Sequence, residues 1–388
     1  MSGRRSIVVI AAAAVAATCV AGATAGSEAQ SAGPAFKQVG KWGKAGTGNG
    51  QFRNPFGIAT DKRGAVYVAD TDNNRVQVFS ASGSFVRKWG TTGSDDGQFL
   101  SAQDVAVDAQ GGVWVADYRN DRVQKFSSGG GFQMSIGASQ PTGVAVDADG
   151  NLFVLEASGR VTKYEKASDY AAGQSWKAGG DGADVEVSAD GHVYAADPGG
   201  LRVNGFDSSG KPSGSMRGGL SSPIGVGVDL DCNVWVGQIA ARRVAKFTPK
   251  GKQLTTISTT DVIPEDIAVG PKGDVYVLGQ TEVLRFAEDK AKPADAAVPG
   301  AIVVTKGVAK VKYMLSGVAC PEQVDATASL AGKGIVGKVN VKLAAGKATV
   351  ISIPVKAAAG STSATFKIVL KTNGRPTTET KNVKVSVR

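Results

Sequence analysis

A motif of about 41 residues recurs six times in the first two-thirds of the chain, and this repetition constrains the fold more than any other feature. Each copy contains an apolar strand, a turn, and a second strand with an aromatic residue three positions after the turn. The turn position holds Gly64, Gly111, Gly150, Gly191, Cys232 and Gly273. The aromatic position holds Tyr67, Trp114, Phe153, Tyr194, Trp235 and Tyr276, although aromatic residues make up only 6% of the chain. Such regularity indicates one structural unit per copy.

Each copy continues with a third strand such as RVQVF or RVQKF, and the better copies add a fourth such as SFVRKWG. Alternating apolar residues mark strands with a buried face, and four short strands in about 41 residues are typical of one propeller blade. A single four-stranded sheet cannot bury both of its faces, whereas six sheets arranged radially can. The sequence therefore predicts an all-β fold with a six-bladed β-propeller.

The sixth copy lacks a convincing fourth strand, because proline and charged residues follow Glu288. An unassigned strand, FKQVGKWG at 36–43, precedes the first full copy and is similar to SFVRKWG. We expect this strand to pair into the sixth blade and close the ring.

The segment GNGQFRNPFGIATDKRGAVYVADTDNNRVQVFSASGSFVRKWG at 48–90 resembles the NHL repeat family, and 95–137 is nearly as similar. The resemblance covers roughly 36–288 and implies a six-bladed propeller. The family includes sensors, protein- or RNA-binding scaffolds and a few lyases, so the resemblance implies a fold rather than a function. The amidating and streptogramin lyases related to this fold rely on histidines that are missing here, so neither activity carries over.

The first 25 residues have the layout of a secretory signal peptide. Arg4 and Arg5 precede an apolar run, and Ala23-Thr24-Ala25 forms a cleavage site. We predict cleavage after residue 25, a disordered segment at 26–35, and no membrane-spanning segment in the mature chain. The Arg pair leaves open whether export follows the general or the twin-arginine route. Cleavage removes Cys19, after which Cys232 and Cys320 either form a disulfide or remain free thiols.

The basic charge of the chain is concentrated at its C-terminal end. Residues 26–298 carry a net charge of −3, whereas residues 299–388 carry +11. After a linker at 289–298, about seven short strands at 299–388 suggest an immunoglobulin-like β-sandwich. Its lysines alternate with valine, which favours a solvated strand face that discourages edge aggregation. The functional alternative is a tether to an anionic envelope polymer or membrane surface.

The single histidine, His192, excludes every site that needs two imidazoles, and its place beside a turn indicates a surface residue. The phosphate-loop pattern GTGNG at 46–50 lacks the required strand-then-helix context.

The first residue of each inner strand alternates between glycine and aspartate around the ring. These positions hold Gly57, Asp104, Gly143, Asp184, Gly225 and Asp266. Asp104, Asp184 and Asp266 would converge near one mouth of the channel, with Glu265 beside them, and such oxygen ligands suit calcium. The structural alternative is that each aspartate bonds local backbone.

The loop after the second strand repeats an Asp, Asn and Arg set. The set comprises Asp70, Asn73 and Arg75 in the first copy and Asp117, Asn120 and Arg122 in the second. Repetition favours a structural role in turns and between blades, because a catalytic residue need occur only once. The nonrepeating Asp72, Tyr118 and Arg119 are the candidates for ligand contact.

We therefore predict an exported, noncatalytic binding scaffold that requires no cofactor and recognises a protein, peptide or glycan of the cell envelope through its loop face. The basic C-terminal domain would be a spacer or an envelope tether, and nucleic acid is not an expected partner of a secreted chain. The alternative is a calcium-dependent hydrolase or lyase with Asp104, Asp184 and Asp266 at the channel mouth.

Overall fold

The computed structural model describes residues 35–289 throughout and, between 301 and 387, the backbone of seven strands. The predicted signal peptide, residues 26–34 of the predicted disordered segment and residues 290–298 of the predicted linker lie outside the described residues. Among the described residues, no helix has the length and apolarity needed to cross a bilayer.

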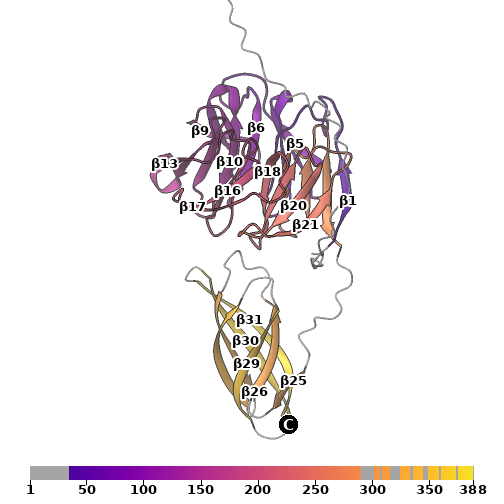
Figure 1. Ribbon diagram of the computed structural model, residues 1–388, viewed down its shortest axis with the longest axis vertical. Coiled ribbons are helices and arrows are strands. Elements are labelled where there is room, and N and C mark those ends of the chain that lie inside the picture. The colour runs from indigo at the N-terminus through magenta and orange to yellow at the C-terminus, as the bar shows by residue number, and fades with distance from the viewer. Residues whose placement is uncertain are drawn as a thin grey trace, which may run out of the picture. The chain divides into compact units, whose positions relative to one another are not determined.

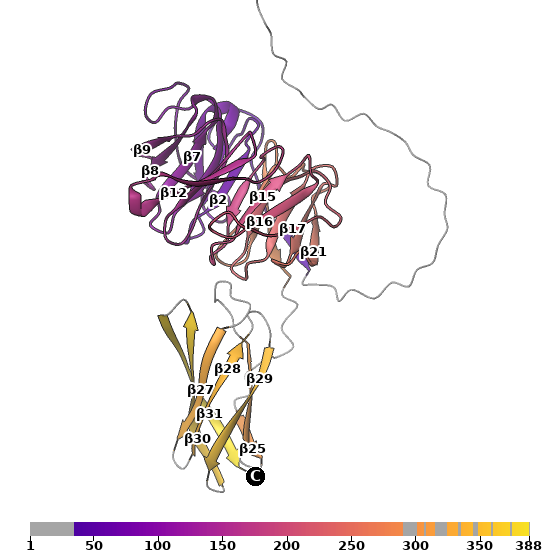
Figure 2. The same cartoon turned by 60° about the vertical axis from the view of Figure 1, so that its left-hand side comes forward.

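Six four-stranded antiparallel sheets form a β-propeller, coloured indigo to orange in Figures 1 and 2. Blade 1 contains β2 (Gly57–Thr60), β3 (Val66–Asp70), β4 (Arg75–Phe79) and β5 (Phe85–Trp89). Blade 2 contains β6 (Ala102–Val107), β7 (Val113–Asp117), β8 (Arg122–Phe126) and β9 (Phe132–Gly137). Blade 3 contains β10 (Pro141–Val146), β11 (Leu152–Glu156), β12 (Arg160–Glu165) and β13 (Ala171–Lys177).

The second half of the propeller repeats this order. Blade 4 contains β14 (Val185–Val187), β15 (Val193–Asp197), β16 (Arg202–Phe206) and β17 (Pro212–Met216). Blade 5 contains β18 (Pro223–Val228), β19 (Val234–Gln238), β20 (Arg243–Phe247) and β21 (Gln253–Ser258). Blade 6 contains β22 (Asp266–Val269), β23 (Val275–Leu278), β24 (Val283–Glu288) and β1 (Phe36–Trp42).

The outermost strand of blade 6 comes from the start of the repeat region. β1 pairs antiparallel with β24, from Phe36 opposite Glu288 to Trp42 opposite Val283. The Phe36 ring packs edge-on against Trp235 at 5.1 Å between centroids, and Trp42 packs against Tyr276 at 6.0 Å. Strands from the two ends of the repeat region therefore share one sheet, and β1 contributes to two core clusters, through Phe36 to the one with Trp235 and through Trp42 to the one with Tyr276.

The core lies between the blades, and the second strand of each blade is its centre. Every residue of β3 is buried, whereas the outermost strand β5 alternates between partly buried and exposed residues. Tyr67 of blade 1 packs in one cluster with Val105 of blade 2 and with Phe99 of the connection that leads into blade 2. Burial of such a side chain contributes about 1.5–3 kcal/mol, so each blade is stabilised chiefly by its neighbours.

The turn between the first and second strands explains its glycine. Gly64, Gly111, Gly150, Gly191 and Gly273 all have φ between 83° and 88°, a conformation that costs glycine little. The blade 5 copy places Cys232 there, with φ of 58°. Cys232 is buried and disulfide-bonded, and its partner lies outside the residues described with side chains.

The C-terminal strands form a separate sheet that closes on itself. The order is β25 (Ala301–Thr305), β26 (Val308–Met314), β29 (Ala348–Ala357), β28 (Ile335–Leu343), β27 (Val324–Gly332), β30 (Gly360–Thr372) and β31 (Arg375–Val387). Parallel pairing of β25 with β31 joins the first strand to the last, so the backbone forms a closed barrel rather than the two sheets of the predicted sandwich. Alternating residues predict strands, but they do not determine which strands pair.

Candidate functional site

In blades 1 and 2, the repeated polar residues hold a loop against one end of the blade. This is the end where the second strand joins the third, and we call it the loop end in every blade. In blade 1, the buried Asp70 accepts a hydrogen bond from the backbone N–H of Arg53 at 2.8 Å and from Nε of Arg75 at 2.7 Å. Nη2 of Arg75 and Nε2 of Gln77 both donate to the carbonyl of Gln51 at 2.8 Å. The Asp70 carboxylate orients the Arg75 and Gln77 side chains, and these donate hydrogen bonds to the carbonyls of the loop. We call this network the blade-to-loop clamp.

Blade 2 repeats the clamp. Asp117 accepts from Nε of Arg122 at 2.8 Å and from Nδ2 of Asn120 at 2.8 Å, while Nη2 of Arg122 donates to the carbonyl of Asp95 at 2.7 Å. In blade 1 the amide of Asn73 donates to Asp70 in the same way. All six repeated loop residues therefore lie in bonds that fix backbone, and neither clamp presents a reactive group to solvent.

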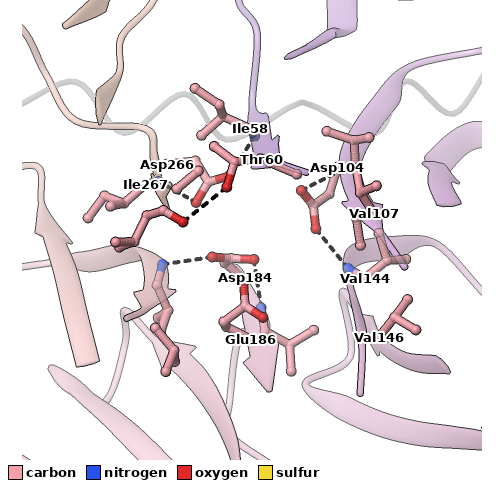
Figure 3. Close-up of a pocket in the computed structure, with 18 residues that line it drawn as sticks. Ile58, Thr60, Asp104, Val107, Val144, Val146, Asp184, Glu186, Asp266 and Ile267 are labelled. Carbon is pink, nitrogen blue, oxygen red and sulfur yellow. Dashed lines mark hydrogen bonds between the residues drawn. The ribbon is translucent and has the colours of Figure 1, made fainter. Parts of the chain in front are cut away.

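The three ring aspartates join blades in pairs (Figure 3). One oxygen of Asp104 accepts from its neighbour's N–H at Val105, 2.6 Å away, and the other accepts from Val144 of the next blade at 2.7 Å. Asp184 bonds Val185 and Val226 of blade 5, at 2.7 Å each. Asp266 bonds Ile267 at 2.6 Å and Ile58 of blade 1 at 2.8 Å, so the last blade is joined to the first.

The glycines of the ring complement these aspartates sterically. A Cβ on Gly57 would lie 2.5 Å from Cα of Asp104, and one on Gly225 would lie 2.5 Å from Cα of Asp266. A Cβ on Gly143 would lie 3.3 Å from Cα of Asp184. Aspartate on even blades thus fills the space that glycine on odd blades leaves open.

Behind the ring lies a cavity of about 190 Å³, which is lined by the inner strands of all six blades. It contains a fourth carboxyl that the sequence analysis missed, Glu186, whose Oε1 accepts from the N–H of Val187 at 2.9 Å. The other five copies place Ala59, Ala106, Ala145, Gly227 and Ala268 at this position. That contrast of one acid with five small residues is a signal visible in the aligned repeats.

Burial dominates the electrostatics of the channel. It raises the pKa of Glu186 to about 8 and the pKa of Asp184 to about 6. Burial also raises the pKa of Asp104 and of Asp266 well above the usual range, and the neighbouring charge of Asp184 adds to both. The channel carboxyls therefore hold protons at pH values where exposed carboxyls have lost theirs.

The ring aspartates, which the sequence predicts as calcium ligands, already serve as hydrogen-bond acceptors between blades. Each of the three aspartates uses both oxygens to accept backbone N–H groups from two blades. Within residues 35–289, no three Asp, Glu, His or Cys side chains gather in an arrangement that would hold a metal ion. A calcium ion at this ring would have to share these oxygens with the hydrogen bonds that join the blades.

Above the ring, at the loop end of the channel, lies a smaller pocket of about 100 Å³ that we call the mouth pocket. Its lining includes the residue that precedes each ring position in all six blades: Phe56, Gln103, Thr142, Ala183, Ile224 and Glu265. These six residues are all different, although the ring directly beneath them alternates strictly. Phe56 is 37% exposed, whereas Glu265 is buried, which raises the pKa of its carboxyl.

The three nonrepeating residues predicted to contact a ligand lie on the same end of the propeller. Asp72 accepts from Nδ2 of Asn54 at 2.7 Å and is exposed. Tyr118 and Arg119 anchor their backbone N–H groups on the carbonyls of Ser101 and Leu100 at 3.1 and 3.0 Å. The Arg119 side chain is exposed and that of Tyr118 partly buried. They lie outside the set that lines the mouth pocket.

His192 lies in the turn between β14 and β15, away from the loop end. Its Nδ1 is 3.2 Å from a carboxylate oxygen of Asp190, and its side chain is 40% exposed. None of the channel carboxyls is among the hydrogen-bond partners described for it. The single imidazole of the chain is therefore a turn residue and has no catalytic partner in the channel.

Comparison with known proteins locates the same repeats. The NHL repeat family model matches residues 52–79 and 99–126. The chain is 51% identical over 45 residues to Protein lin-41 of Caenorhabditis elegans, which covers 12% of this chain and 4% of that protein. It is 48% identical over 44 residues to E3 ubiquitin-protein ligase TRIM71 of Rattus norvegicus, which covers 11% of this chain and 5% of that protein. The matches thus span a small fraction of these relatives.

Among solved structures, the chain is similar to a streptogramin B lyase, with a TM-score of 0.48 and 14% identity over 67% of this chain and 99% of that one. A virginiamycin B lyase from Staphylococcus aureus gives a TM-score of 0.47 and 15% identity over 63% of this chain and 82% of that one. Likenesses at this level carry no argument about activity. The sheet topology and the repeat matches together show that the chain contains NHL repeats within a six-bladed β-propeller.

Proposed function

We propose that the chain is a noncatalytic binding scaffold that recognises a protein or peptide partner through the loop end of its propeller. The mouth pocket is the observation that carries this proposal, because its six unlike residues interrupt an otherwise repetitive surface. Repeated residues are used in clamps and in blade-to-blade bonds, which leaves the nonrepeating ones to distinguish a ligand.

The size and chemistry of the mouth pocket suit one protruding side chain. At about 100 Å³ it lies well below the roughly 300–1,000 Å³ of typical small-molecule sites. Phe56 and Ile224 supply apolar surface, while Gln103, Thr142 and Glu265 supply polar groups. Asp72, Tyr118 and Arg119 would contact the partner outside the pocket, as an outer polar rim around a central anchor.

The metal-dependent hydrolase or lyase finds less support. The ring aspartates already accept two N–H groups each, and His192 is not among their hydrogen-bond partners. We propose instead that the ring fastens the blades, and we derive no reaction step through a metal.

We also propose that the chain is exported and that residues 299–388 are a spacer or a tether that attaches it to an anionic envelope polymer. The leader-like residues 1–25 and the net charge of +11 support this proposal. Binding of the full chain to isolated envelopes should weaken steeply as salt rises. A variant with Lys310, Lys312 and Lys342 replaced by Gln should bind more weakly at low salt. Equal binding of the wild type and the variant at every salt concentration would contradict the proposed tether.

The binding proposal is tested by selecting ligands from a displayed peptide library on the full chain. The selected peptides should lose affinity for a Phe56→Ala/Arg119→Ala variant. The same peptides should bind a Lys62→Ala/Lys252→Ala variant with unchanged affinity, because this variant changes exposed residues at the opposite end of the blades. Peptides that bind both variants equally would contradict recognition at the loop end.

A further inference from the structure

Blade 3 lacks a loop that blades 1 and 2 both possess. The segment between the glycine at the end of each outermost strand and the ring position of the next blade has 13 residues before blade 1, at 44–56, and 13 before blade 2, at 91–103. Before blade 3 it has only five residues, 138–142. The chain therefore shows the same blade geometry with and without this loop.

In blades 1 and 2 the long connection lies across the third strand and is held by its backbone. Oε1 of Gln77 accepts from the N–H of Gly50 at 2.9 Å, and Oε1 of Gln124 accepts from the N–H of Gly97 at 2.9 Å. The clamp arginine donates to the carbonyls of Thr47, Gly48 and Gln51 in blade 1. The bound segment thus presents successive carbonyl and N–H groups in a Gly-Gln-Phe context.

Blade 3 keeps the clamp residues in altered form. Glu156, Arg160, Thr162 and Tyr164 take the places that Asp, Arg, Gln and Phe hold in blades 1 and 2. All four line a groove of about 520 Å³, which is bordered by Gly137–Ser139 at the end of blade 2 and by β13. The groove lies over the third strand, where blades 1 and 2 hold their long loops.

The clamp arginine of blade 3 is oriented but has no carbonyl to hold. Nε and Nη2 of Arg160 donate to the two carboxylate oxygens of Glu156, each at 3.1 Å. Within residues 35–289 its guanidinium donates to no backbone carbonyl, and its side chain is 52% exposed, compared with 7% for Arg75. A preoriented arginine with free donors therefore faces an open groove.

We propose that this groove binds an extended segment of another protein, of the Gly-x-x-x-Gly-Gln-Phe type, in the manner of the chain's own loops. Carbonyl groups of the segment accept from Arg160, and the Thr162 hydroxyl bonds its backbone. The two such loops of this chain are already seated on blades 1 and 2, so the occupant comes from another protein. The site goes beyond the mouth pocket and does not depend on it.

The test uses a labelled peptide with the sequence of residues 93–100, GSDDGQFL, and the full chain, with binding followed by fluorescence anisotropy. Wild type should bind saturably, and a scrambled peptide should not. Arg160→Ala should weaken binding about tenfold or more, because charge-assisted hydrogen bonds are lost. Thr162→Gln restores the residue of blades 1 and 2, and should tighten binding several-fold.

Two further variants keep the test specific. Arg202→Ala removes the matching arginine of blade 4, which pairs with Asp197, and should leave peptide binding unchanged. Replacing residues 138–142 with the sequence of 91–103 should fill the groove from within and abolish binding. Absence of saturable binding to both wild type and Thr162→Gln would overturn the proposal, as would binding that survives both Arg160→Ala and the loop replacement. Phe56→Ala should not affect this peptide, so failure here is distinguishable from failure of the mouth pocket.

Discussion

Replacement of Glu186 by Gln should remove a stability cost that grows with pH. Folding raises the pKa of this carboxyl from 4.5 to about 8, chiefly through burial. The folded protein therefore binds the proton more tightly than the unfolded chain does. Below pH 4.5 the Glu186 carboxyl is protonated in both states and does not reduce stability. Stability then falls as the pH rises toward about 8, the pKa of the folded state, and levels off above it. Glutamine keeps the Oε1 acceptor for the N–H of Val187 but does not titrate.

The size of the effect follows from the shift. Each pKa unit corresponds to about 1.4 kcal/mol, so a shift from 4.5 to about 8 sets an upper limit of about 5 kcal/mol. Glu186 borders a cavity and is not fully sequestered from it, so we expect about 2 kcal/mol. For a domain of this size that is a difference of roughly 4–8 °C in Tm.

The assay is thermal unfolding of wild type and Glu186→Gln at a series of pH values from about 5 to about 9. The Tm of the variant relative to wild type should rise across this interval and then become constant. Glu288→Gln, which changes an exposed carboxyl at the end of β24, serves as the matched control and should show no such rise. A constant difference in Tm between Glu186→Gln and wild type at every pH would show that the Glu186 carboxyl does not lose its proton in this interval.

Two other changes test the ring and the clamp by chemical denaturation. Gly57→Ala should cost about 1–3 kcal/mol, because its Cβ would lie 2.5 Å from Cα of Asp104, whereas Gly218→Ala meets no atom within 4 Å and should cost far less. Equal costs would contradict steric complementarity in the ring. Arg75→Lys should cost about 2–3 kcal/mol, because lysine cannot reach both Asp70 and the loop carbonyls. Arg202→Lys breaks one partly exposed contact with Asp197 and should cost less stability. If it lowered the free energy of unfolding as much as Arg75→Lys does, the loop contacts of Arg75 would add no stability.

The repeat allowed the propeller to be predicted, because one offset between turn and aromatic residue recurs in all six copies. The positions of the ring aspartates also followed from the repeat, but their partners did not. The second N–H bonded by Asp104 belongs to Val144, 40 residues along the chain, and no local pattern specifies that pairing.

Other features were present in the sequence but carried no obvious meaning there. Glu186 differs from small residues in five copies, and the short connection at 138–142 differs from two long ones. Each becomes informative only when the fold shows that the first faces a cavity and that the second leaves a groove. The C-terminal strands were predictable as strands, whereas the parallel contact between β25 and β31 depends on long-range pairing.

We propose that the acidic ring fastens the blades of a binding scaffold rather than holding a catalytic metal. Thermal unfolding of the full chain with calcium or EDTA, beside an Asp104→Asn/Asp184→Asn/Asp266→Asn variant, tests it most directly. We predict no calcium-dependent shift in wild type and a lower Tm for the variant in both conditions, because each Asn amide would oppose a backbone N–H. A calcium site at 100-fold saturation would stabilise wild type by about 2.7 kcal/mol. A shift of that size, lost in the variant, would contradict the account and make the ring a metal centre.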